Sequence, residues 1–158
     1  MFRKILVMGL PGNGKTTLAT APAKQLSAVH FNADRVRDEL YLGSLGFSID
    51  DRIEHARRMG WMCDRVVESG HFAIADLVCP TEQTRQAFGK ALVIWMDRNQ
   101  VCRYPDTCGL FEPSHYDVRI SEGSVEAAVE RVRSCLMSKH EEPTCNGPKE
   151  FYLTSIAP

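Results

Sequence analysis

The order of apolar and polar residues along the chain predicts strands that alternate with helices. Short apolar runs of the kind found in buried strands are separated by segments with helical spacing. The expected strands cover residues 5–8, 28–31, 71–80, 91–97 and 116–120. The expected helices cover residues 14–26, 33–40, 52–69 and 81–88, and a last helix begins at Ser121 or Ser124 and continues to about residue 136. This alternation predicts a three-layer α/β fold in which a five-stranded parallel sheet is flanked by helices.

Two segments have neither strand nor helix spacing. Residues 98–115 show no clear period, and we expect a long, mobile, lid-like loop there. Residues 141–158 form a C-terminal tail that begins as a polar linker. With 158 residues and a hydrophobic content of 44%, the chain has the size of one ordinary domain. We therefore expect a single domain over residues 1–158.

The segment between the first strand and the first helix carries a specific motif. Residues 9–16 match G-x-x-x-x-G-K-[ST], the phosphate loop, or P-loop, of nucleotide-binding proteins. Glycines allow backbone N–H groups to turn toward phosphate oxygens, Lys15 can reach the β- and γ-phosphates, and the hydroxyl of Thr16 suits Mg²⁺. We therefore expect a P-loop domain that binds a nucleoside triphosphate with Mg²⁺. The expected nucleotide-binding residues are Gly9, Leu10, Pro11, Gly12, Asn13, Gly14, Lys15, Thr16 and Thr17.

Charge and hydropathy limit the class of partner. The formal net charge of −1 gives no basic field for nonspecific binding of nucleic acids, so the expected partner is a small molecule. No apolar run approaches the roughly 18 residues of a membrane span, and the first residues lack the apolar core of a signal peptide. These features predict a cytoplasmic protein that does not cross a membrane.

The six cysteines show no spacing typical of a metal site. The chain has no C-x-x-C and no cysteine–histidine pair at zinc-finger spacing. Because cytoplasmic thiols normally stay reduced, we expect neither zinc nor disulfide bonds. A redox switch formed by Cys102 and Cys108 is the less favoured alternative.

A carboxylate interrupts the third expected strand. Asp76 lies near the carboxyl end of this strand, where ligands bind in an open α/β sheet. It is a candidate for Mg²⁺ or its water shell, and a paired structural aspartate is an equally good interpretation. In the long helix, Arg52, His55 and Met59 share one face. Such cationic faces are usually solvated, but one beside a phosphate loop is also a candidate for ligand binding.

Four segments resemble one family of P-loop kinases, the adenylylsulfate kinase (APS kinase) family. GLPGNGKTT resembles its phosphate loop, FNADRVR its L-D-G-D-N-V-R segment, LGFSIDDRIEHARR its L-G-F-S-x-x-D-R-x-E-N-x-R-R segment, and LVCP its I-S-P turn. The resemblance covers about the first hundred residues. It implies a kinase that transfers the γ-phosphoryl group of ATP, with Mg²⁺, to a hydroxyl of adenylylsulfate, and it leaves a homodimer open.

The resemblance also implies roles for individual residues. Asp34 matches the acidic residue that acts on the acceptor hydroxyl, so Lys15 and Asp34 are the expected catalytic residues. Arg37, Phe47 and Arg52 match residues that hold adenylylsulfate. The expected substrate-binding set is Asn32, Arg37, Phe47, Arg52, His55, Val78 and Cys79, and the expected metal ligands are Thr16 and Asp76.

Departures from the family pattern lie on the acceptor side. Asn32 stands where the family has its first aspartate, His55 where it has asparagine, and Cys79 where it has serine. Residues 109–113 lack the lysines of the family's lid. We therefore predict detectable but inefficient turnover of adenylylsulfate. An ionisable histidine also predicts stronger binding of an anionic acceptor under mildly acidic conditions.

The sequence leaves three functions open. The first is adenylylsulfate kinase activity. The second is a related kinase activity on another nucleotide, a hydroxylated base or a nucleic-acid end. The third is a nucleotide-binding switch without phosphoryl transfer, and Asp34 beside Arg37 argues against it because a switch needs no acceptor site.

Overall fold

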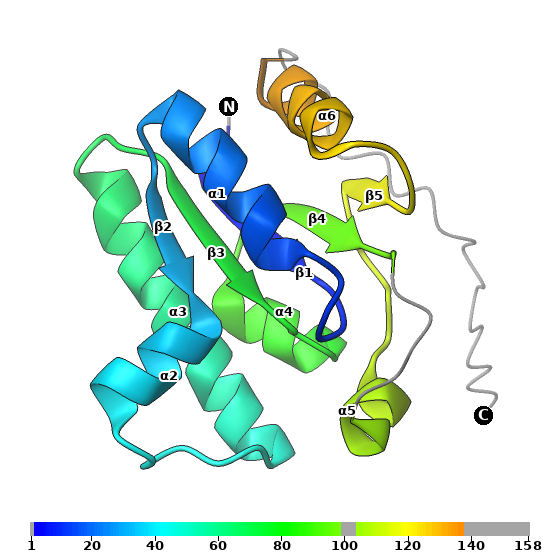
Figure 1. Ribbon diagram of the computed structural model, residues 1–158. Helices are drawn as coiled ribbons and strands as arrows, with labels where there is room; N and C mark the ends of the chain where they lie inside the picture. The colour runs from blue at the N-terminus through cyan, green and yellow to red at the C-terminus, as the bar shows by residue number, and fades with distance from the viewer. Residues whose placement is uncertain (1, 99–103, 138–158) are drawn as a thin grey trace, which may run out of the picture.

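The computed structural model describes residues 2–98 and 104–137, in which five parallel strands form one sheet in the order β2-β3-β1-β4-β5. The strands are β1 (Lys4–Met8), β2 (Val29–Asn32), β3 (Ala73–Leu77), β4 (Leu92–Met96) and β5 (Val118–Ile120). The helices are α1 (Lys15–Leu26), α2 (Ala33–Tyr41), α3 (Ile49–Glu68), α4 (Glu82–Phe88), α5 (Pro105–Leu110) and α6 (Val125–Met137). Figure 1 shows helices on both sides of the sheet.

The central strand β1 divides the hydrophobic core into two halves. Successive side chains of a strand point to opposite faces of the sheet, so its apolar residues serve both faces. Ile5 and Val7 pack with apolar residues of α1 and α6 on one face. Leu6 and Met8 pack with residues of α3 and α4 on the other. A continuous apolar run is what a strand buried on both faces requires.

The expected fold is confirmed. All five strands are parallel, and the helices expected from the spacing are present with shifts of a few residues. Asn32 caps α2, since its side chain accepts a hydrogen bond from the backbone N–H of Arg35. Ser48 caps α3 in the same way, with the backbone N–H of Asp51 as donor. The fold is a three-layer α/β P-loop fold.

The expectation of a long loop at residues 98–115 was wrong in part. Residues 105–110 form the short helix α5, which begins at Pro105, a residue whose fixed φ suits the first turn of a helix. The backbone N–H of Glu112 also donates to the carbonyl of Pro80 at 2.7 Å, which ties this segment to the turn that follows β3. Residues 99–103 and the expected tail at 141–158 lie outside the described residues, and the single domain stays a prediction.

The expectation that no disulfide bond forms was also wrong. Cys108 in α5 is disulfide-bonded, whereas Cys63 and Cys79 are buried free thiols. Pairing depends on whether the fold brings two cysteines within about 7 Å between their Cα atoms, which residue spacing does not reveal. None of the helices in the described part of the chain is long and apolar enough to span a membrane.

Helices α3 and α4 approach each other closely at Gly60. A Cβ atom at Gly60 would lie 2.2 Å from the carbonyl oxygen of Phe88, far inside van der Waals contact. Phe88 is itself buried beneath α3. The absence of a side chain at position 60 therefore lets the two helices cover the same face of the sheet.

We predict that Gly60→Ala lowers the free energy of unfolding by about 2 kcal/mol, because the added methyl group forces the backbone of α4 away from α3. Urea denaturation measures this change. Gly109→Ala is the matched control, since no atom lies within 4 Å of a Cβ there and alanine favours a helix. Equal stability of the Gly60→Ala variant and the wild type would contradict the close packing.

Candidate functional site

The phosphate loop joins β1 to α1 and is pressed against the end of β4. Gly9, Gly12 and Gly14 have positive φ angles of 150°, 86° and 80°. A Cβ at Gly9 would lie 2.5 Å from the carbonyl oxygen of Met96, so only glycine fits there. The side chain of Asn13 donates to the same carbonyl at 2.7 Å. The loop therefore has the curvature that turns backbone N–H groups toward an anion.

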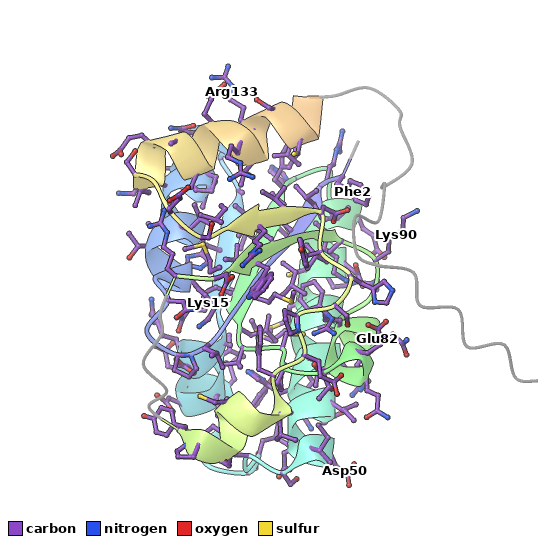
Figure 2. All side chains as sticks on the ribbon, turned by 90° about the vertical axis from the view of Figure 1, so that its right-hand side faces the viewer. Phe2, Lys15, Asp50, Glu82, Lys90 and Arg133 are labelled. Carbon is purple, nitrogen blue, oxygen red and sulfur yellow. The ribbon has the colours of Figure 1, made fainter. Side chains whose placement is uncertain are left out.

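Lys15, labelled in Figure 2, is the first residue of α1. Its Nζ atom donates to the carbonyl of Leu10 at 2.9 Å. Burial lowers the pKa of Lys15, and the negative charges of Asp76 and Asp34 oppose this effect. The ammonium group of Lys15 thus lies near two carboxylates: Asp76, an expected metal ligand, and Asp34, which is expected to act on the acceptor.

A cavity of about 820 Å³ opens beside this loop. It joins the expected phosphate-binding residues to residues of α2, α3, β3 and α5. Its lining includes Pro11, Gly12, Gly14, Lys15, Thr16, Thr17, Asp34, Phe47, Arg52, Asp76, Val78, Tyr104 and Thr107. A smaller adjoining cavity of about 50 Å³ is lined by Arg37, His55, Val78, Cys79 and others. The structure therefore brings the expected donor and acceptor residues to one place.

The hydroxyl of Thr16 belongs to a hydrogen-bonded cluster at the carboxyl ends of β2 and β3. The amide nitrogen of Asn32 donates to the Thr16 hydroxyl at 3.1 Å and to a carboxylate oxygen of Asp76 at 2.8 Å. The ring of His30 lies 2.7 Å from the other oxygen of Asp76. The sequence did not point to His30, because only the pairing of β2 with β3 places it beside Asp76.

These residues fit a Mg²⁺·ATP complex. The cavity beside the glycine-rich loop has room for phosphates, Lys15 supplies a positive charge, Thr16 supplies a hydroxyl at the loop, and Asp76 lies in the lining of the cavity. No group of three or more His, Cys, Asp or Glu side chains that could hold a metal occurs among residues 2–98 and 104–137. Mg²⁺ in kinase sites is typically held by few protein oxygens together with phosphates and waters, so such a group is not needed.

The acceptor side contains two arginines around an exposed aromatic ring. The guanidinium groups of Arg37 and Arg52 lie 4.7 and 5.6 Å from the ring centroid of Phe47. Phe47 is 65% exposed. Arg37 donates to the carbonyls of Leu45 and Gly46. Arg52 is buried and donates to the carbonyl of Phe47, at 2.9 Å.

Neither arginine is neutralised by an ion pair among the described residues. The hydrogen-bond partners of Arg37 are backbone carbonyls, and the second partner of Arg52 is the hydroxyl of Thr107 at 2.9 Å. Glu54, by contrast, pairs with Arg57 and Arg58. Two positive charges therefore remain available for an anionic acceptor.

His55 lies in the buried wall of the smaller cavity, with 5% of its surface exposed. Burial, followed by the positive charge of Arg37, lowers the pKa of His55 to about 4, against a smaller opposing effect of the Ala33 backbone. The expectation that His55 ionises near neutral pH was therefore wrong. The sequence identified the imidazole, but its buried surroundings depend on how α2 and α3 pack.

Val78 and Cys79 follow β3; Val78 lines both cavities and Cys79 lines the smaller one. Cys79 has a positive φ of 48°, a conformation that non-glycine residues rarely adopt. Burial raises the pKa of its thiol to about 12, so the sulfur stays protonated and is not a nucleophile. Its carbonyl accepts a hydrogen bond from the buried Arg85. Cys79 therefore shapes the cavity as a neutral, compact side chain.

Sequence reasoning missed the contribution of α5. Thr107 is buried and holds Arg52, while Tyr104 and Asp106 line the larger cavity. The start signal at Pro105 could have indicated a helix, but nothing in the spacing linked it to α3. This contact between elements far apart in the sequence exists only in the folded chain.

Comparison with known proteins agrees with this geometry. A family model for adenylylsulphate kinase matches residues 3–117. The chain belongs to the adenylylsulphate kinase family. The bifunctional enzyme CysN/CysC of Rhodopirellula baltica is 35% identical over 119 residues, which cover 68% of this chain and 18% of that protein. The adenylyl-sulfate kinase of Synechococcus sp. (strain JA-3-3Ab) is 33% identical over 113 residues, covering 65% of this chain and 64% of the relative.

The match covers less than two thirds of the length of these two curated relatives. Solved structures of the adenylylsulphate kinase family share the fold. The Mycobacterium tuberculosis APS kinase CysC in complex with AMPPNP and APS has a TM-score of 0.74 at 20% identity, covering 87% of this chain and 98% of that one. The hexameric APS kinase from Thiobacillus denitrificans has a TM-score of 0.66 at 26% identity, covering 84% of this chain and 28% of that one.

The lowered pKa of His55 predicts a steeper loss of stability in acid. The unfolded chain binds a proton near pH 6.5, whereas the folded chain resists it until about pH 4, so stability falls as the pH decreases through this window. Between pH 7 and pH 5 we expect His55 to lower the free energy of unfolding by about 2 kcal/mol.

Urea denaturation of the wild type and of His55→Asn over this pH range measures the difference. The asparagine variant lacks the titrating ring and should lose less stability on acidification. Parallel pH profiles of the two proteins would show that the folded chain does not depress the pKa of His55.

Proposed function

We propose that the chain transfers the γ-phosphoryl group of ATP to a hydroxyl group of adenylylsulfate. The observation that carries this proposal is that one cavity joins the phosphate loop to Asp34, Phe47 and Arg52. A nucleotide-binding switch needs no such second side. Membership of the adenylylsulphate kinase family supports the same reaction, and the names of the relatives support adenylylsulfate as the acceptor.

On the donor side, the chain's own residues would bind and orient the triphosphate. Backbone N–H groups of residues 9–17 and the ammonium of Lys15 would surround the phosphates and neutralise the charge that develops during transfer. Thr16 and Asp76 would hold Mg²⁺, Thr16 through its hydroxyl and Asp76 at the water shell. The metal ion supplies further charge neutralisation when bound.

On the acceptor side, Asp34 would orient the hydroxyl and accept its proton. Asp34 is exposed in the first turn of α2 and lines both cavities. Arg37 and Arg52 would bind the anionic part of the acceptor, and the ring of Phe47 would contact the base. Asn32, His55, Val78 and Cys79 would complete this side, with His55 as a neutral hydrogen-bonding group at pH 7.

Two further features stay predictions. We expect a cytoplasmic location, and a homodimer stays open; the hexameric relative from Thiobacillus denitrificans gives general support to self-assembly. Light scattering coupled to gel filtration would measure the number of copies.

The first test is ATP consumption with and without adenylylsulfate, compared with a panel of other hydroxyl-bearing nucleotides and sugars. We predict adenylylsulfate-dependent turnover in the wild type and a loss of at least about 100-fold in Lys15→Ala, because this lysine stabilises charge in the transition state. Lys24→Ala, in the exposed last turn of α1, is the control. Near wild-type turnover by Lys15→Ala would refute the proposed kinase activity.

We predict that Asp34→Asn lowers kcat by about 100-fold or more and changes the KM for ATP by less than about 3-fold. The carboxylate would act on the acceptor proton in the transition state, and in the described residues no hydrogen bond joins it to the phosphate loop. Steady-state kinetics with each substrate varied in turn separates the two constants. Asp38→Asn, on the same helix, is the matched control. An equal change in kcat and in the KM for ATP would contradict this role.

A further inference from the structure

Asp76 is a buried carboxylate with both oxygen atoms already engaged by protein groups. Its side chain is among the buried polar residues, at 2% exposure. One oxygen accepts from the amide of Asn32 at 2.8 Å, and the other contacts the ring of His30 at 2.7 Å. Asn32 and Asp76 are direct neighbours in the register of β2 and β3. Contacts with two residues of β2 therefore fix the orientation of the Asp76 carboxylate, so it cannot rotate freely toward the phosphate loop.

Asn32 transmits this fixed position to the phosphate loop. Its oxygen accepts from the backbone N–H of Arg35 at 2.9 Å, so its nitrogen must point the other way. Both amide hydrogens are used, one for Asp76 and one for the hydroxyl of Thr16. Rotation of the amide by 180° would break all three contacts. The hydroxyl of Thr16, which accepts from Asn32, keeps a lone pair for another partner.

We propose that Asp76 and Asn32 form a positioning pair, an amide and a carboxylate on neighbouring strands, that fixes the Thr16 hydroxyl for a Mg²⁺·nucleotide complex. The inference rests on the proposed function, which places Mg²⁺·ATP at this loop. Asp76 acts on the Thr16 hydroxyl through Asn32, because its carboxylate contacts Asn32 and His30 and the amide of Asn32 contacts Thr16; this role is additional to that at the water shell of Mg²⁺. On this inference the pair needs one amide and one carboxylate at positions 32 and 76. It should work equally well when the two groups exchange positions.

The pair can be exchanged between the strands by two substitutions. In the variant Asn32→Asp/Asp76→Asn, the carboxylate at position 32 can accept from Arg35, from the new amide at position 76 and from the Thr16 hydroxyl. The amide oxygen at position 76 can accept from His30. All four contacts are retained, and only the direction of donation changes within the pair and at Thr16.

Each single substitution removes part of this arrangement. Asn32→Asp places two carboxylates against each other, where the present contact is 2.8 Å, and removes the donor to Thr16. Asp76→Asn removes the negative charge and leaves two amides facing each other. The two single variants should therefore be impaired, and the exchanged variant should recover.

The experiment measures the affinity for a non-hydrolysable ATP analogue by calorimetry, with and without Mg²⁺, in the wild type and the three variants. We expect Mg²⁺-dependent affinity to fall about 10-fold or more in each single variant and to return to within about 3-fold of the wild type in the exchanged variant. Affinity without Mg²⁺ should change less than about 2-fold in the exchanged variant, which keeps the net charge, and this distinguishes positioning from a general loss of structure. Circular dichroism checks that each variant folds.

The outcomes separate the inference from the proposed function. In one outcome the wild type binds the analogue, but the exchanged variant loses as much Mg²⁺-dependent affinity as the losses of the two single variants multiplied together. The positioning pair is then refuted and the kinase proposal stands. If the wild type does not bind the analogue, the proposed function fails and the inference with it. If the exchanged variant does not fold, His30→Gln and His30→Leu replace it, because only glutamine keeps a donor for Asp76. Equal Mg²⁺-dependent affinity of these two variants would then overturn the inference.

Discussion

The site depends on the close approach of the phosphate loop to the end of β4. The carbonyl of Met96 lies where a side chain at Gly9 would be, and it also accepts the hydrogen bond from Asn13. A backbone carbonyl at a strand end is a fixed point, because its strand is locked into the sheet. The positions of Lys15 and Thr16 follow from this contact, since α1 starts where the loop ends. The neighbouring strand thus sets the anion site as firmly as β1 does.

Electric charge is distributed unevenly over α2 and α3. The outward-facing arginines of α3, Arg57, Arg58 and Arg65, pair with glutamates on the same helix. The arginines that line the cavities, Arg37 and Arg52, instead donate to carbonyls and a hydroxyl, which are uncharged and leave the positive charges in place. These two arginines therefore place positive charge on the wall of the cavity, in a chain of nearly zero net charge.

Local signals in the sequence were sufficient for the fold and for the phosphate loop. A strand, a glycine motif and a helix start are contiguous, and apolar runs identify buried parallel strands without knowledge of their neighbours. The surroundings of individual groups were not predictable in the same way. The low pKa of His55 depends on the packing of α2 on α3, and the contact of His30 with Asp76 depends on strand register. Helix α5 was missed because six residues are too few to show a period.

The bond between Arg52 and Thr107 joins a residue of α3 to a helix that follows β4 in the chain. Arg52 also lines both cavities. The position of α5 and the binding of a molecule to Arg52 are therefore linked. Such linkage is reciprocal: a molecule that draws Arg52 away from Thr107 loosens α5, and anything that holds α5 in place changes the affinity for that molecule by the same factor. A single hydroxyl group thus couples two elements that are far apart in the sequence across one cavity.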